Sequence, residues 1–109
     1  MNAEEVWEAL VAEGVENPIE LKTKTGLHFK IVSNGKMLTV KNSENEPSSK
    51  VKIPRSIYKD NFVKVFPYYE RWVNGERGLS TKLTAITGNS VYIMAAIGYE
   101  VKKWSLQQR

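Results

Sequence analysis

Lysine shows the clearest chemical pattern in this chain, because it recurs at alternate positions in stretches of apolar and β-branched residues. Such alternation places the lysines on one face of a β-sheet and the apolar residues on the other. The lysines predicted to share the polar face are Lys22, Lys30, Lys41, Lys50 and Lys52, with Glu20 as the acid that partly offsets them. Such a surface binds phosphate backbones, because each neutralised phosphate releases counterions. Alternatively, these lysines only protect the sheet from edge-to-edge aggregation.

A second candidate site surrounds Gly88, in a predicted turn between helices over residues 80–86 and 90–103. A short helix, a glycine-containing turn and a second helix form the outline of a helix-turn-helix, with Asn89 and Ser90 placed like recognition residues. Alternatively, unpaired backbone N–H groups at Gly88, Asn89 and Ser90 hold one phosphate. The strongly apolar sequence of the second helix favours a third interpretation, in which Asn89 or Ser90 simply caps a buried helix.

His28, the one histidine, raises the question of catalysis. A histidine among lysines could exchange protons in a small ribonuclease, because imidazole titrates near neutral pH. The sequence shows no paired carboxylates, no nucleophile with its base and no phosphate-binding glycine motif, and its one aspartate, Asp60, is distant along the chain. With no cysteine and one histidine, a metal centre is nearly excluded. We therefore expect a non-enzymatic protein without a cofactor, with the ribonuclease as an alternative.

The net charge of +4 hides an asymmetry along the 109 residues. Residues 1–19 hold five glutamates and no basic residue, so the rest of the chain carries a charge of +9. A basic body predicts a polyanionic partner, which makes nucleic acid the leading interpretation. A protein–protein module is the alternative, with the acidic N-terminal segment or the aromatic residues around Tyr68 and Trp72 as its surface. In a chain this small, such aromatic residues are expected more often in the core.

Apolar periodicity predicts the elements that position these residues, beginning with a helix over residues 3–13. Asn2 is suited to cap its N-terminus, and Gly14 to end it in a left-handed conformation. Alternating residues then predict two strands joined by a three-residue loop, which pairs Leu21 with Phe29 and keeps their apolar faces together.

Two more strands complete the predicted sheet. Asn34-Gly35 is a strong signal for a two-residue type I′ turn. The pairs that follow from this turn are Ile31 with Leu38 and Phe29 with Val40. After a polar loop, alternation over residues 50–53 predicts a fourth strand that points Val51 and Ile53 inward and ends at Pro54.

Helical spacing returns after Pro54. A helix is predicted from residue 55 until Pro67 kinks or ends it, because proline lacks an N–H donor. The expected fold is one α+β domain over residues 1–109, with an N-terminal helix, a four-stranded antiparallel meander, and two or three C-terminal helices packed on one face of the sheet. No apolar run approaches the ~18 residues of a membrane span, and the acidic N-terminus lacks the apolar core of a signal peptide. We therefore expect a cytoplasmic protein.

Overall fold

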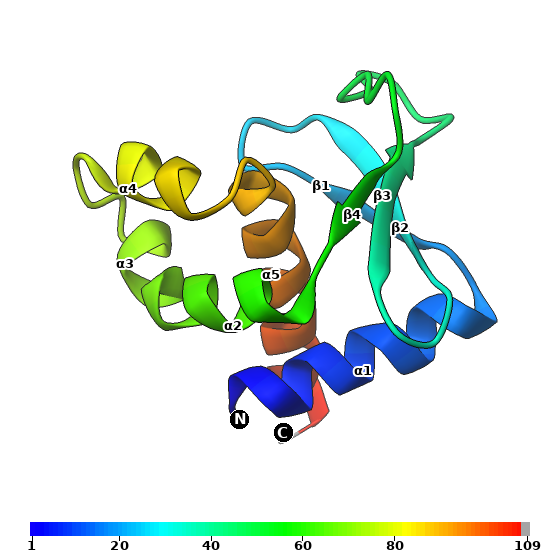
Figure 1. Ribbon diagram of the computed structural model, residues 1–109, viewed down its shortest axis with the longest axis horizontal. Helices are drawn as coiled ribbons and strands as arrows, with labels where there is room; N and C mark the ends of the chain where they lie inside the picture. The colour runs from blue at the N-terminus through cyan, green and yellow to red at the C-terminus, as the bar shows by residue number, and fades with distance from the viewer. Residues whose placement is uncertain (108–109) are drawn as a thin grey trace.

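Strands and helices occupy separate parts of the chain in the computed structural model, which describes residues 1–107. A helix, α1 (Ala3–Glu16), is followed by four strands: β1 (Ile19–Lys22), β2 (His28–Ser33), β3 (Leu38–Asn42) and β4 (Arg55–Ile57). The remaining elements are α2 (Lys59–Val65), the 3₁₀ turn η1 (Phe66–Tyr68), α3 (Tyr69–Val73), α4 (Leu79–Ile86) and α5 (Ser90–Gln107). Figure 1 shows the sheet on one side of the molecule and helices α2 to α5 on the other. The predicted α+β fold class is confirmed.

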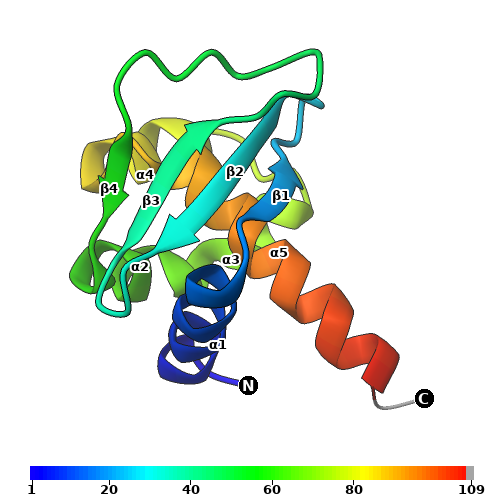
Figure 2. The same cartoon turned by 90° about the vertical axis from the view of Figure 1, so that its right-hand side faces the viewer.

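The four strands form an antiparallel meander in the order β1-β2-β3-β4. Alternate side chains point into the layer between sheet and helices, and the buried ones are Ile19, Leu21, Phe29, Ile31, Leu38, Val40 and Ile57. Figure 2 looks onto the opposite, open face, with helices α2 to α5 behind the strands. All of these core residues except Ile57 are predicted to face the helices, so the alternation assigned the two faces of β1 to β3 correctly.

Helix α1 begins as predicted but extends further. The side chain of Asn2 accepts a hydrogen bond of 2.9 Å from the Glu5 N–H, which confirms the predicted cap. Gly14 does not end the helix, because it lies buried inside α1, where a Cβ atom would be only 3.0 Å from the Cβ of Ser33. The glycine is therefore needed for the close approach of α1 to β2, and the helix ends at Glu16.

Both predicted hairpins form, but only the first has the predicted register, with Leu21 opposite Phe29. The second is shifted by two residues. Its observed pairs are Ile31 with Val40 and Phe29 with Asn42, where the prediction has Leu38 and Val40 as the partners. A shift of two residues keeps every side chain on its own face, so the prediction is wrong in register and right in the assignment of faces.

The loop between β2 and β3 explains this shift, because it contains residues 34–37 and not two residues. Only Gly35 has a positive φ, of 92°, whereas a type I′ turn needs two such residues. The side-chain oxygen of Asn34 accepts hydrogen bonds from the N–H groups of Lys36 and Met37, at 2.9 and 3.0 Å. These bonds stabilise the wider loop.

The predicted strand over residues 50–53 does not form, and β4 lies at Arg55–Ile57 instead. Lys50 has a left-handed φ of 52°, which interrupts an extended strand at its first residue. Val51 is buried whereas Ile53 is 77% exposed, so the alternation in sequence does not correspond to a pleat. Pro54 therefore precedes the edge strand instead of ending it, a position where its missing N–H is tolerated.

The C-terminal helices differ from the predictions mainly in their limits. Helix α2 begins at Lys59 and not at residue 55, because β4 takes up the preceding residues. Pro67 lies in η1, which separates α2 from α3 as the predicted kink requires. Helix α5 runs beyond its predicted end, and its buried side chains fill the centre of the helical layer: Ile93, Met94, Ala96 and Ile97. Within residues 1–107, no helix combines the length and apolar character needed to cross a membrane.

Candidate functional site

The open face of the sheet carries three of the five predicted lysines, namely Lys22, Lys30 and Lys41 on β1, β2 and β3. Lys50 and Lys52 are absent from it, because their segment is a loop and not a strand. The prediction that five lysines share this face is therefore wrong. The predicted basic surface is divided between two places.

Carboxylates lie close to the three sheet lysines. Glu20 is opposite Lys30 in the register, and the Nζ atom of Lys30 lies 3.1 Å from Oε1 of Glu44. The hydrogen bond from Lys30 lowers the pKa of Glu44 below its usual value. Glu20 also accepts a hydrogen bond of 2.8 Å from the Ser43 hydroxyl. With two acids among three lysines, this face offers little net positive charge to a polyanion.

His28 lies on the same open face, opposite Lys22. Its backbone N–H donates to the Pro47 carbonyl and its own carbonyl accepts from the Ser49 N–H, so the chain after β3 returns beside β2. Within residues 1–107, its imidazole forms no ion pair with a carboxylate. The structure therefore does not bring His28 together with an acidic partner for proton transfer.

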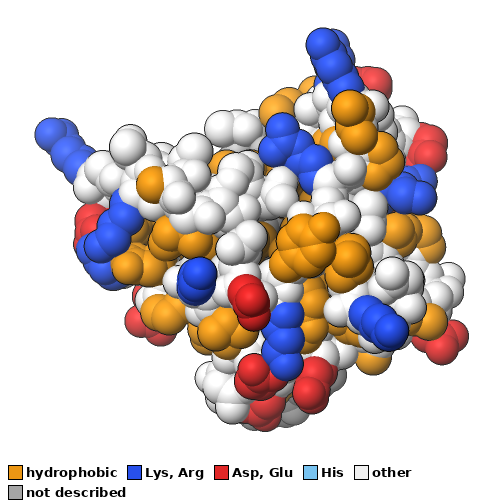
Figure 3. Space-filling view, viewed as in Figure 1, with side chains coloured by type: hydrophobic (Ala, Val, Ile, Leu, Met, Phe, Trp, Pro, Cys, Tyr) orange, Lys and Arg blue, Asp and Glu red, His pale blue; other side chains and the backbone are white. Residues whose placement is uncertain are grey.

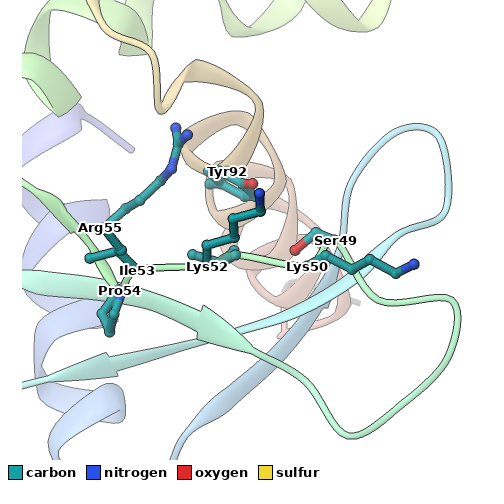
Figure 4. A pocket seen from close by; sticks show the side chains of 8 residues that line it. Ser49, Lys50, Lys52, Ile53, Pro54, Arg55 and Tyr92 are labelled. Carbon is teal, nitrogen blue, oxygen red and sulfur yellow. The ribbon is translucent and has the colours of Figure 1, made fainter.

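Lys50 and Lys52 lie instead beside a hollow next to the first turn of α5, together with Arg55. We refer to residues 50–55 as the basic loop. This loop, Ser49 and Tyr92 line the hollow, whose volume is about 410 Å³. In Figure 4 the side chains of Lys52 and Arg55 rise on the side of Tyr92, while Lys50 extends away from it. Three cations from one short segment thus border a single concave surface.

Tyr92 of α5 forms the wall of the hollow that faces the basic loop. Its ring packs edge-on against Phe29 of β2, with ring centroids 4.9 Å apart. The guanidinium carbon of Arg55 lies 5.9 Å from the Tyr92 centroid. The hydroxyl of Ser49 is buried and has no hydrogen-bond partner among the described residues. The hollow thus combines cations, an aromatic ring and an unused hydroxyl, which are groups that bind phosphate and stack with bases.

The cations of the basic loop lack acidic neighbours. In the described part of the chain, Lys50, Lys52 and Arg55 form no salt bridge. Arg55 donates only to neutral oxygens, the Gly88 carbonyl and Oδ1 of Asn89, both at 3.3 Å. Figure 3 shows a similar separation over one whole side of the molecule, with basic side chains standing out at the top and acidic ones gathered at the bottom over α1. Charge that is partly neutralised on the sheet face is left exposed here.

Arg55 is the residue of this cluster that the sequence analysis missed. Its expected position was the first turn of a helix, whereas it opens β4 and joins that strand to the turn between α4 and α5. The signal in the sequence was Pro54, because a proline in sheets is confined to edge strands, strand beginnings and bulges.

The turn between α4 and α5 lies near the basic loop, but most of its predicted binding groups are in use. The Asn89 amide donates to the Ser56 carbonyl at 3.1 Å. The N–H groups of Asn89 and Ser90 donate to Thr87, at Oγ1 and at the carbonyl oxygen, and Ser90 is only 5% exposed. The predicted phosphate site on unpaired N–H groups at Gly88, Asn89 and Ser90 is therefore not formed. The turn instead holds β4 against α5, which is a core helix.

A second cluster of titratable side chains lies between α1 and α5. It consists of Glu13, Tyr99, Glu100 and Lys103, and we call it the α1–α5 network. The Nζ atom of Lys103 lies 2.8 Å from Oε2 of Glu13 and 3.6 Å from Oε1 of Glu100, and the Tyr99 hydroxyl donates to Glu13. Burial acts to raise the pKa of Glu13, but hydrogen bonds from Lys103 and Tyr99 outweigh it and lower the pKa. At Glu100, which is 1% exposed, burial dominates and raises the pKa.

The aromatic residues around α3 are half-buried and pack against the core. The Nζ atom of Lys24 lies 4.8 Å from the centroid of Trp72. The cationic groups of Arg71 and Lys82 lie 5.2 and 5.0 Å from the centroid of Tyr68. Cations of the same chain therefore already contact these two rings.

No family model, curated protein or solved structure matches this chain. In the part of the chain that the structure describes, no group of three or more His, Asp or Glu side chains is placed to hold a metal ion. Among the surfaces described above, the basic loop is the one where several cations meet without carboxylate partners.

Proposed function

We propose that this protein binds nucleic acid without catalysing a reaction on it, and that the basic loop contacts the phosphate backbone. The supporting observation is the grouping of Lys50, Lys52 and Arg55 around one hollow, with no salt bridge to any of them among the described residues. Three like charges in one short segment repel one another in the isolated protein, and a polyanion relieves that repulsion. Each neutralised phosphate also releases counterions, which adds to the free energy of binding.

The cations are suited to phosphate in different ways. Lys50 and Lys52 are exposed, and their ammonium groups can neutralise neighbouring phosphates as point charges. Arg55 uses Nη1 for its bonds to Gly88 and Asn89, which leaves Nε and Nη2 to bind a phosphate as a fork. The ring of Tyr92 beside them provides a surface on which a sugar or base can pack.

The hollow supplies binding groups but no pair for proton transfer. Its lining contains neither a carboxylate nor a histidine, and His28 lies on the sheet face instead. Cationic side chains neutralise phosphate charge, whereas cleavage of RNA also needs a group that accepts a proton. These features favour binding without catalysis over the ribonuclease alternative.

A salt series tests the proposal and counts the contacts. Fluorescence anisotropy with labelled double-stranded DNA, single-stranded DNA and RNA gives the slope of log K against log salt, which is about −0.9 per phosphate contact on duplex DNA. We expect the variant K50Q/K52Q/R55Q to lose about 2.7 units of slope on duplex DNA, equivalent to roughly three contacts. The matched sheet-face variant K22Q/K30Q/K41Q should lose less than about 1 unit.

Two results would overturn the proposal. If none of the three nucleic acids binds at low salt, the basic loop has a different partner, and a protein with an acidic surface becomes the next candidate. If both triple variants lose the same slope, the contacts are spread over the basic surface and the basic loop is not the site.

A further inference from the structure

The basic loop also presents a large apolar side chain to solvent. Ile53 is 77% exposed, the highest value among the large hydrophobic residues of the described chain, and Pro54 beside it is exposed as well. Lys52 precedes Ile53 directly and Arg55 follows two residues later, so cations lie on both sides of it. Water around a branched apolar side chain is unfavourable, and a partner that covers Ile53 would remove this penalty.

Two anchors hold the segment that carries Ile53. On one side Val51 is 6% exposed in the core, and its N–H donates to Oδ1 of Asn42. On the other side Arg55 is paired with β3 in the sheet and bonded to the turn before α5. Only residues 52–54 lie between these anchors, and Pro54 has a fixed φ. Ile53 is therefore displayed by a short constrained segment and not by a long loop.

We propose that Ile53 is a wedge that enters the minor groove of duplex DNA, partly unstacks two base pairs and bends the duplex. This inference rests on the proposed function and specifies its ligand as double-stranded DNA. Proteins that kink DNA insert Phe, Leu, Ile, Met or Pro between base steps from the minor groove, and cationic side chains bind the adjacent phosphates. The basic loop combines these groups, with Ile53 as the wedge and Lys52 and Arg55 as the flanking cations.

Two features favour duplex DNA over an anionic membrane. A membrane-bound surface needs a broad apolar face, whereas the basic loop exposes one large apolar side chain, Ile53, which is sufficient for a wedge. The cationic surface beside the wedge is concave and includes Tyr92, which fits a curved phosphate chain better than a flat bilayer. Because pyrimidine–purine steps unstack most easily, we expect the strongest bending at a TA step.

Energy transfer between dyes at the two ends of a duplex of about 25 base pairs, with one central TA step, measures the bend. Wild-type protein should increase the transfer on binding. The I53S variant should bind with affinity reduced by about tenfold or less, from the lost apolar contact, and should lose most of the increase in transfer. Its salt slope should not change, because no cation is removed. The matched control is V73S on α3, where Val73 is 51% exposed, and it should bend DNA as wild type does.

The wedge is overturned if I53S bends the duplex as much as wild type, or if wild type binds without bending. Neither result contradicts the proposed function, which fails only if no nucleic acid binds at low salt or the basic loop carries no contact. Vesicles of phosphatidylserine and phosphatidylcholine form the third arm of the experiment. Vesicle binding by wild type that I53S loses would assign Ile53 to a membrane, and would also overturn the wedge.

Discussion

Charged side chains have different roles at the two ends of helix α5. In the α1–α5 network, toward its C-terminal end, the charged groups contact one another. In the basic loop, near its first turn, the cations have no acidic partner among the described residues. About 16 Å of helix separates Tyr92 from Lys103, given a rise of about 1.5 Å per residue. One end of α5 therefore uses its charge inside the fold, and the other leaves it exposed.

This difference shows that a count of basic residues does not locate a binding surface. Lys103 carries the same charge as Lys52, but a carboxylate of Glu13 lies 2.8 Å from it. The sheet face is intermediate, because Lys30 is paired with Glu44 while its neighbouring lysines form no salt bridge in the described part of the chain. The distinguishing property of the basic loop is the lack of carboxylates around its cations, which depends on neighbours in space.

Reversing charge in the basic loop should have the largest effect on this comparison. The variant K50E/K52E changes the net charge from +4 to 0, and K22E/K41E makes the same change on the sheet face. At about 0.1 M salt we expect the loop variant to bind about 100-fold more weakly, because it loses two contacts worth about 0.9 log units each. The sheet-face variant should lose about fivefold or less, since more distant charges are screened.

Anisotropy at one salt concentration measures both affinities, and circular dichroism checks that both variants fold. All four lysines are exposed, so we expect no change in the spectra. Equal losses of affinity would mean that net charge matters and its location does not, which would remove the distinction between the two surfaces.

Faces of the sheet were more predictable than register. Alternation placed Leu21, Phe29 and Ile31 in the core because a period of two is a local property that survives a shift of two residues. The four-residue loop after β2 was not predictable, because Asn34-Gly35 fits more than one kind of turn and the strand pairing decides between them.

Composition of the candidate site was more predictable than its location. Lys50 and Lys52 were candidate residues, but alternation placed them on the sheet, since nothing local distinguishes a short strand from an extended loop. The partners of Arg55 are Gly88 and Asn89, which lie 33 and 34 residues along the chain. Contacts at such separations depend on the packing of β4 against α5, which no local pattern encodes.

A smaller effect concerns stability at the other end of α5. Glu100 is buried, its Oε1 atom has no hydrogen-bond partner among the described residues, and burial raises its pKa above the usual value. A carboxyl group of this kind contributes stability at low pH, and the contribution is lost as the pH rises through the raised pKa. In the variant E100Q this titration is absent. The unfolding free energy of E100Q relative to wild type should therefore rise between about pH 4 and pH 7, by about 1.5 kcal/mol, the penalty for an incompletely hydrogen-bonded buried group.

Denaturant unfolding at several pH values measures this difference. Glu13 provides the contrast, because its lowered pKa means that its contribution is present above the usual value and lost as the pH falls. The variant E13Q should therefore show the opposite trend relative to wild type. A difference between E100Q and wild type that does not depend on pH would contradict the role assigned to burial. Nucleic-acid affinity should be unchanged in E100Q, because the α1–α5 network is not part of the basic loop.

The smallest effect would come from exposing charge that is now neutralised on the sheet face. The variant E20Q/E44Q removes the acids beside Lys30, and glutamine keeps an oxygen that can accept the hydrogen bond from Ser43. We expect this variant to bind nucleic acid about fivefold more tightly, with a salt slope steeper by about one contact, because Lys30 becomes available to a phosphate. A salt series by anisotropy measures both quantities.

The matched control is E5Q/E8Q on α1, which raises the net charge by the same amount at two exposed positions without a salt bridge in the described chain. If E5Q/E8Q strengthens binding as much as E20Q/E44Q, then affinity follows net charge and the position of the carboxylates is irrelevant. If only E20Q/E44Q steepens the slope, the carboxylates are what keep the sheet face from binding. The sheet face and the basic loop each carry three cations, so their acidic neighbours would then account for the difference between them.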